Sequence, residues 1–211
     1  MVNMCYEAIK MPNFDQPYNI FSSFSPFYPV PSNQLNALLL NCGHIMCRDH
    51  AYNWNGLRRG NQELMIWQYT VSGMGRLRFG NNEYEVPPGY GFLLLVPENH
   101  CYYLPENAEE WEFMYIGAFG SDMIRLAGEL RRKYGFLCHF EPESKTVMTL
   151  RQILSEHQLR TPSCYEACAQ AYRFIMAMFD DMSNAPEAAG SNLLNLVSDY
   201  CRAHAAEPIS V

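Results

Sequence analysis

Glycine and proline divide residues 64–119 into short apolar runs, and this punctuation limits the possible fold more than any other feature of the chain. Glycine-containing corners stand at residues 73–75 and 80–82, and a Pro-Pro-Gly corner at 87–89 precedes the apolar run 92–96. Runs of this length, bounded by such residues, are typical of β-strands. Short strands at close spacing predict a small antiparallel barrel.

Aromatic side chains recur at every second position in two of the predicted strands. Trp111, Phe113 and Tyr115 share one face of the first, and Trp67 and Tyr69 share one face of the second. Because these faces carry so many large aromatic side chains, we predict that they line the barrel interior and enclose a small molecule. Packing of an ordinary core would produce the same pattern, so the residues alone leave both interpretations open.

The order of these segments resembles the cupin-like effector-binding domain of AraC-type transcription regulators. The matching strings are VSGMG, VPPGYGFLLLVPENHCYY and EEWEFMYIGAFG, with NCGHIMC upstream. The resemblance runs from about residue 35 to the last residue. It implies a mainly β fold with C-terminal α structure: a cupin-like barrel (a double-stranded β-helix, or jelly roll) followed by an α-helical dimerisation region.

The resemblance also implies a ligand pocket inside the barrel, with an arginine at its mouth. Its register favours Arg58 over the neighbouring Arg59 for this role. A guanidinium offers a rigid fork of donors, which suits vicinal hydroxyls or a carboxylate. The predicted effector is a sugar or a sugar derivative. The predicted ligand-binding residues are His44, Arg58, Trp67, Tyr69, His100, Tyr102, Trp111, Phe113 and Tyr115.

Three helices are predicted after the barrel, over about residues 121–135, 144–157 and 163–182. The last carries apolar residues at alternating spacings of three and four. This stripe suits a helix packed on its own barrel and equally the seam of a homodimer, and the resemblance favours the dimer. The predicted seam residues are Tyr165, Cys168, Tyr172, Ile175, Phe179 and Met182.

The predicted organisation has four parts. Residues 1–34 form an N-terminal arm rich in aromatic residues, and 35–120 form the effector-binding barrel. Residues 121–183 form the helical dimerisation and linker region. Residues 184–211 contain a linker and the first helix of a helix-turn-helix DNA-binding domain, which the resemblance implies is truncated here. DNA would be bound only through that missing C-terminal domain.

Composition excludes several other classes of protein. A formal net charge of −7 over 211 residues disfavours a nucleic-acid footprint on this part of the protein. No apolar run approaches the roughly 20 residues that span a bilayer, and the N-terminus lacks a secretory pattern. We therefore predict no membrane association and a cytoplasmic location. The eight cysteines are interpreted as reduced thiols.

Enzyme chemistry is the main alternative to sensing. Metal-dependent cupins use a His-x-His pair, which this chain does not contain. Cys42, His44, Cys47 and His50 have an unusual spacing for zinc, and strand alternation would place Cys47 on the face opposite Cys42. His100 has no nucleophile motif beside it. We predict a non-enzyme without catalytic residues, metal or cofactor, and the alternative is a metal-independent cupin enzyme acting on a sugar.

Overall fold

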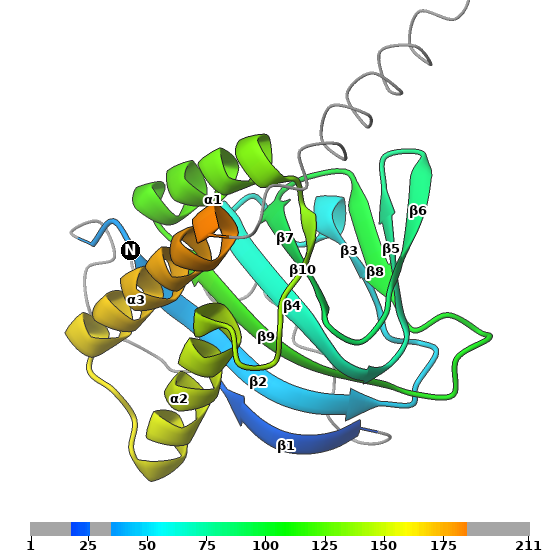
Figure 1. Cartoon of the computed structure of the whole chain (residues 1–211), viewed down its shortest axis with the longest axis horizontal. Helices are drawn as coiled ribbons and strands as arrows, with labels where there is room; N and C mark the ends of the chain where they lie inside the picture. The colour runs from blue at the N-terminus through cyan, green and yellow to red at the C-terminus, as the bar shows by residue number, and fades with distance from the viewer. Residues whose placement is uncertain (1–17, 26–34, 185–211) are drawn as a thin grey trace, which may run out of the picture.

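Two antiparallel sheets and three helices make up the described part of the protein, which covers residues 18–25 and 35–184 of this computed structural model (Figure 1). One sheet has the strand order β1-β2-β9-β4-β7-β10, and the other has the order β3-β8-β5-β6. The strands are β1 (Tyr18–Phe24), β2 (Leu38–Cys47), β3 (Asn53–Asn55), β4 (Leu64–Gly73), β5 (Gly75–Phe79), β6 (Asn82–Val86), β7 (Tyr90–Val96), β8 (His100–Tyr103), β9 (Trp111–Phe119) and β10 (Leu137–His139). The predicted mainly β, cupin-like fold with C-terminal helices is confirmed.

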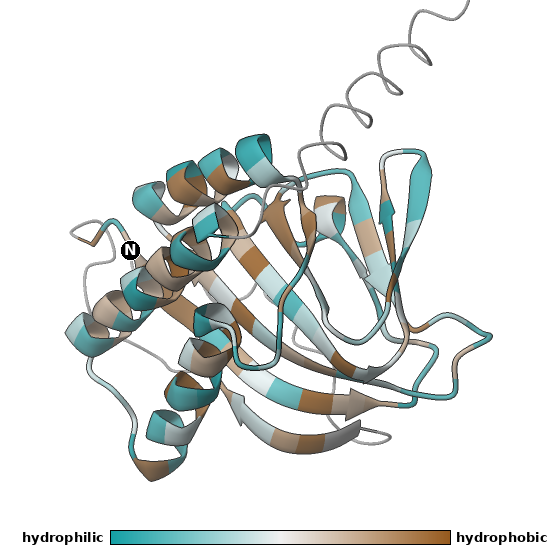
Figure 2. Ribbon diagram, viewed as in Figure 1, coloured by the Kyte–Doolittle hydropathy of each residue, from teal (hydrophilic) through white to brown (hydrophobic). Residues whose placement is uncertain are grey.

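The helices are α1 (Ser121–Tyr134), α2 (Lys145–Leu159) and α3 (Cys164–Asn184), and they lie over one face of the larger sheet (Figure 1). They occur where the apolar spacing predicts them. Ser144 caps α2 by accepting a hydrogen bond from the Val147 amide, at 3.4 Å. Polar and apolar bands alternate along all three helices, as expected of elements that bury one side only (Figure 2).

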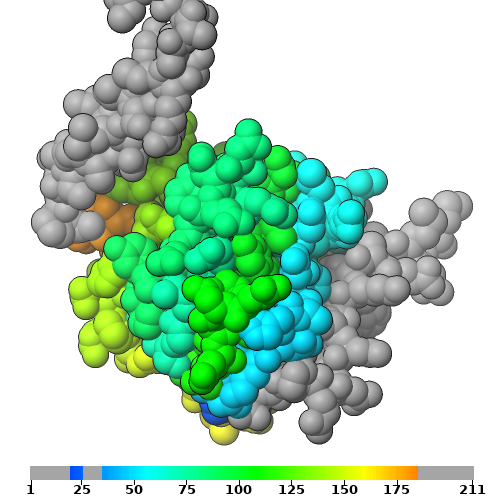
Figure 3. All heavy atoms as spheres, turned by 90° about the vertical axis from the view of Figure 1, so that its right-hand side faces the viewer, coloured from blue at the N-terminus to red at the C-terminus, as the bar shows by residue number. Residues whose placement is uncertain are grey.

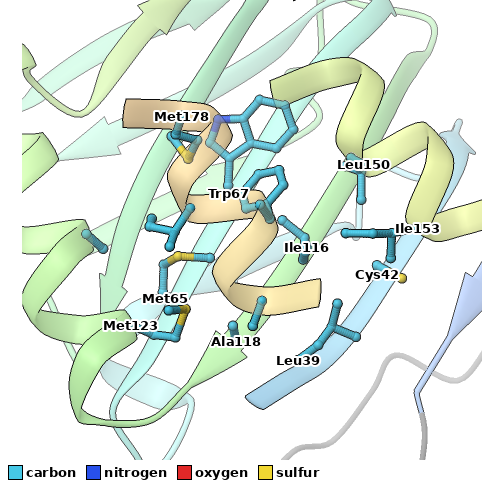
Figure 4. Packing of buried hydrophobic residues seen from close by; sticks show 14 of the residues in the cluster. Leu39, Cys42, Met65, Trp67, Ile116, Ala118, Met123, Leu150, Ile153 and Met178 are labelled. Atoms are coloured by element: carbon cyan, nitrogen blue, oxygen red, sulfur yellow. The ribbon is translucent and has the colours of Figure 1, made fainter. Parts of the chain in front are cut away.

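The protein has a hydrophobic core on each face of the larger sheet. One core fills the space between this sheet and the three helices, and the other fills the barrel lumen between the two sheets. Figure 4 shows the first, in which Met65 and Trp67 of β4 lie near Met123 of α1, Leu150 of α2 and Met178 of α3. Strand β4 is therefore buried on both faces.

Burial on both faces corrects the predicted direction of two aromatic side chains. Trp67 and Tyr69 do share a face and stack at 5.7 Å between ring centroids, but that face packs against the helices. Trp67 also meets Phe174 of α3 edge to face, at 5.3 Å. The number of aromatic side chains on a face does not show whether that face points to the lumen or to the helices, because both faces of the strand exclude water.

Part of the predicted N-terminal arm is a regular strand. β1 pairs antiparallel with β2 at the edge of the larger sheet, although residues 1–34 show no sustained sequence period. Phe24 of β1 packs on the His157 ring of α2, with centroids 4.0 Å apart. The rest of the arm, and the predicted linker and DNA-binding segment beyond residue 184, lie outside the described residues.

The outer face of the smaller sheet is polar. Figure 3 shows this side of the molecule, where β5, β6 and β8 appear in shades of green. Arg76 of β5 pairs with Glu85 of β6, with 3.1 Å between Nη2 and Oε1.

Six cysteines in the described residues are free thiols. Across 18–25 and 35–184, no helix combines the length and apolarity that crossing a bilayer requires.

Candidate ligand-binding site

A cavity of about 50 Å³ lies inside the barrel lumen. Strands β2, β4 and β9 of the larger sheet each contribute alternate residues to it, and β3 and β8 of the smaller sheet close the opposite side. Tyr52 and Arg59 come from the segments that flank β3. The lining residues are Asn41, Ile45, Tyr52, Trp54, Arg59, Ile66, Gln68, Tyr102, Phe113 and Tyr115.

Aromatic rings account for the small volume of the cavity. Tyr52 lies 5.4 Å from Phe113 and 6.0 Å from Trp111 between ring centroids, and Phe113 lies 4.9 Å from Trp111. Phe92 and Tyr102 fill the lumen from the other side, 5.1 Å apart. A space of this size holds only a few water molecules.

Arg59 provides the positive charge of the cavity. Its Nη1 donates a hydrogen bond to the Tyr102 hydroxyl at 2.8 Å, and its guanidinium lies over the Trp54 ring, 4.5 Å from the centroid. Burial raises the pKa of the Tyr102 phenol, and the Arg59 charge partly offsets that rise. Tyr102 therefore stays protonated at neutral pH.

Gln68 and Tyr115 supply two further polar groups. The Gln68 Oε1 accepts a hydrogen bond from the Tyr52 hydroxyl at 3.4 Å, and its Nε2 is buried without a partner among the described residues. The Tyr115 hydroxyl lies 3.3 Å from the Ser23 Oγ of β1. Burial raises the pKa of Tyr115 to about 12, although the Ser23 contact opposes the rise.

The structure brings Arg59, and not Arg58, to the cavity. Gly56–Arg58 forms a single 3₁₀ turn that Asn55 caps through the Leu57 amide, at 2.9 Å. Successive residues of such a turn point about 120° apart. Arg58 is exposed at the end of the turn, whereas Arg59 is half-buried and lines the lumen. The register of the family resemblance is not fine enough to separate adjacent residues in such a turn.

Of the other residues predicted to bind ligand, Tyr102, Phe113 and Tyr115 line the cavity, and their contact with a ligand stays a prediction. Trp111 is buried in the lumen core without lining the cavity. His100 is also buried, with its ring 6.2 Å from that of Tyr102.

His44 points away from the lumen, because it alternates with Ile45 along β2. Its Nε2 lies 2.9 Å from Glu112 Oε1, on the outer face of the sheet. Ser72 donates to the other oxygen of the same carboxylate at 2.6 Å.

Several lining residues were not predicted from the sequence. Gln68 could have been predicted from the sequence, since it is a polar residue inside the apolar run of β4 and a buried amide needs hydrogen-bond partners. Trp54 and Tyr52 come from a short strand and a loop without a sequence period. The lining residues absent from the prediction are Asn41, Ile45, Tyr52, Trp54, Arg59, Ile66 and Gln68.

A half-buried ion pair connects the barrel to α1. The Glu98 carboxylate accepts two hydrogen bonds from the Arg131 guanidinium, each at 2.9 Å. The His100 Nδ1 lies 3.8 Å from Glu98 Oε2, beyond hydrogen-bond distance. Burial favours the neutral form of Glu98, but the neighbouring His100 and Arg131 outweigh it and lower its pKa from 4.5 to about 2.

This ion pair predicts a component of acid denaturation. Because the pKa of Glu98 is lower in the folded chain, the pair contributes stability above about pH 4.5 that is lost as the pH falls toward 2. The contribution should be roughly 2–3 kcal/mol. Urea unfolding of Glu98→Gln between pH 2 and 7 should show a deficit at pH 7 that disappears near pH 2. Glu110→Gln, which breaks the exposed pair with Arg48, is the matched control and should leave the pH profile nearly unchanged.

Within residues 18–25 and 35–184, no three His, Cys, Asp or Glu side chains converge in a way that could hold a metal ion. Cys42 faces the helices and Cys47 faces the lumen, so the two thiols of the possible zinc cluster lie on opposite sides of β2. The absence of a catalytic metal remains a prediction.

Comparison with known proteins identifies the family. The sequence profile of the AraC-like ligand binding domain matches residues 43–193. Among solved structures, the AraC-like transcriptional activator CuxR aligns with 89% of this chain and 72% of its own, at 9% identity and a TM-score of 0.47. A comparison with curated proteins gives no match.

Two further solved structures align over about half of this chain. An HTH_3 family transcriptional regulator from Vibrio cholerae aligns over 48% of this chain at 16% identity and a TM-score of 0.34, and the alignment spans 51% of that regulator. The Cupin_2 domain of an XRE family transcriptional regulator from Enterobacter cloacae aligns over 48% of this chain and 96% of its own, at 13% identity and a TM-score of 0.33. Since the family profile covers well over half of the sequence, this chain belongs to the AraC-like ligand binding domains, the cupin-like domains of AraC-type transcription regulators.

Proposed function

We propose that this domain senses a small hydroxylated molecule, a sugar or a sugar derivative, by binding it in the barrel cavity. The observation that carries the proposal is a lumen in which one cation and several polar side chains stand among aromatic rings. Aromatic faces pack against the apolar faces of sugar rings, while hydroxyls need directional partners such as Arg59, Gln68 and Tyr115.

Binding of a sugar-sized ligand requires the cavity to open. Small-molecule sites are usually about 300–1,000 Å³, several times the volume present here. Trp54, Arg59 and Tyr115 are the half-buried members of the lining, so they are the side chains whose displacement costs least. We infer that these three move outward as the ligand enters.

A chain of contacts supports transmission from the cavity to the helices. Arg59 holds the Tyr102 hydroxyl, and the Tyr102 ring faces that of His100. His100 adjoins Glu98, which pairs with Arg131 of α1. A ligand that draws Arg59 away from Tyr102 would favour one arrangement of these groups over another, a shift in the population of two states.

Helix α1 is tied in turn to α3. The Tyr172 hydroxyl of α3 donates to the Asp122 carboxylate of α1, at 2.6 Å. We infer that α3 carries the response to a homodimer partner and to a DNA-binding domain beyond the chain, in the cytoplasm. Of the predicted seam residues, those that remain exposed or half-buried are Tyr165, Cys168, Tyr172 and Phe179, and Met176 is exposed beside them.

Calorimetry of the purified chain with a panel of pentoses, hexoses and their sugar acids, together with native mass spectrometry for a retained molecule, tests this function. We expect saturable binding of a compound that is recovered unchanged. Ile45→Phe, which enlarges a lining residue, should abolish binding, whereas Met46→Phe makes a similar change on the outer face of β2 and should not. Consumption of the bound compound would instead make the domain an enzyme.

A further inference from the structure

The charge of the cavity lining is unbalanced. Arg59 is the one charged side chain among the lining residues, all of which belong to the described part of the chain. Elsewhere Arg48, Arg76 and Arg131 each pair with a glutamate. Among residues 18–25 and 35–184 Arg59 forms no salt bridge. Its guanidinium contacts a phenol and an indole ring, although the whole chain carries a net charge of −7.

Hydrogen-bond donors without an acceptor also remain at this site. The Gln68 Oε1 is occupied by the Tyr52 hydroxyl, so its unpartnered Nε2 is the group left to bond. Gln68 is 2% exposed, which deprives that donor of water. Only Nη1 of Arg59 has a hydrogen-bond partner among the described residues, and it donates. The phenol of Tyr115 stays protonated at neutral pH and can donate as well.

We propose that the ligand of this cavity carries a carboxylate, so that the effector is a small hydroxylated acid, such as a sugar acid, and not a neutral sugar. This inference rests on the proposed function. An ionised carboxylate only accepts hydrogen bonds. It matches the Gln68 NH₂, which has no acceptor, and the guanidinium of Arg59, whose N–H groups other than those on Nη1 have none among the described residues. The hydroxyls of a neutral sugar would bring donors that need acceptors, and would leave the Arg59 charge without a counterion.

Calorimetry with matched pairs of acid and neutral compound tests the inference. The probes are galacturonate against galactose, and glycerate against glycerol, at constant ionic strength. We expect at least one acid to bind more tightly than its neutral partner by roughly tenfold or more. Arg59→Gln should lose that preference, and Arg59→Lys should retain part of it because the charge remains. Arg58→Gln alters the exposed neighbour and is the matched control, with binding unchanged.

Each outcome separates this inference from the proposed function. If neutral sugars bind as tightly as their acids, or if Arg59→Gln keeps the preference for the acid, the carboxylate assignment fails and sugar sensing stands. If neither acids nor sugars bind to the folded chain, both fail. Circular dichroism of Arg59→Gln confirms that any loss of binding is not a loss of fold. Gln68→Leu gives an independent check, since it removes the unpartnered donor without changing charge and should weaken acid binding.

Discussion

Ile175→Glu should unfold the chain instead of releasing a folded monomer. Ile175 is completely buried in the core between α3 and the larger sheet, although the sequence pattern placed it in the middle of a dimer seam. A carboxylate at that position would be desolvated without a partner. We expect a loss of about 4 kcal/mol or more of unfolding free energy, the range reached by unpaired buried charges.

Met176→Glu is the matched control, because Met176 is the next residue of α3 and is 45% exposed. The control should keep the helical signal in circular dichroism and unfold cooperatively in urea. Sedimentation of the same variant then reports whether the exposed side of α3 holds a partner. A folded, monomeric Ile175→Glu would show that Ile175 belongs to a dimer seam after all, contrary to its burial in a single chain.

The two halves of the helical stripe explain why the sequence could not choose between core and seam. Ile175 and Met182 are buried within the chain, while Tyr165 is 69% exposed. The helix is apolar over more than one face, and spacings of three and four occur on both faces. Periodicity therefore predicts the helix and its approximate ends. It does not predict which stripe meets the sheet, since that depends on where α1 and α2 pack.

In the strands, too, the sequence predicts the element but not the direction in which its side chains point. Corners at glycine and proline predict the barrel because these residues permit or force turns in any context. The direction of a side chain depends on what covers each face of the sheet. His44 and Trp67 therefore point away from the lumen despite their chemistry, and Gln68 points into it. The most informative residue of β4 was the polar one in an apolar run, because a buried amide needs a reason to be there.

Trp111→Ala should destabilise the fold strongly while acting on ligand binding only through that loss. Trp111 is completely buried at the start of β9, one alternation beyond Phe113 and away from the cavity. Its Nε1 donates to the Thr70 Oγ1 at 2.9 Å, and Thr70 donates in turn to the Val86 carbonyl. Removing an indole of this kind from a core costs about 3–5 kcal/mol.

The space around the ring shows why the lumen would not adapt to its loss. A Cβ on Gly75 would clash with the Trp111 ring, so the backbone of β5 already lies directly against the indole. Deleting the ring would therefore leave a cavity. Trp111→Phe keeps an aromatic ring but lacks the indole N–H, and should lose only about 1–3 kcal/mol. Urea unfolding followed by circular dichroism measures all three proteins. If Trp111→Ala retained wild-type stability and lost ligand affinity, Trp111 would be a ligand-contacting residue, as its place in the aromatic pattern first suggested, and the cavity would have to extend to that end of the barrel.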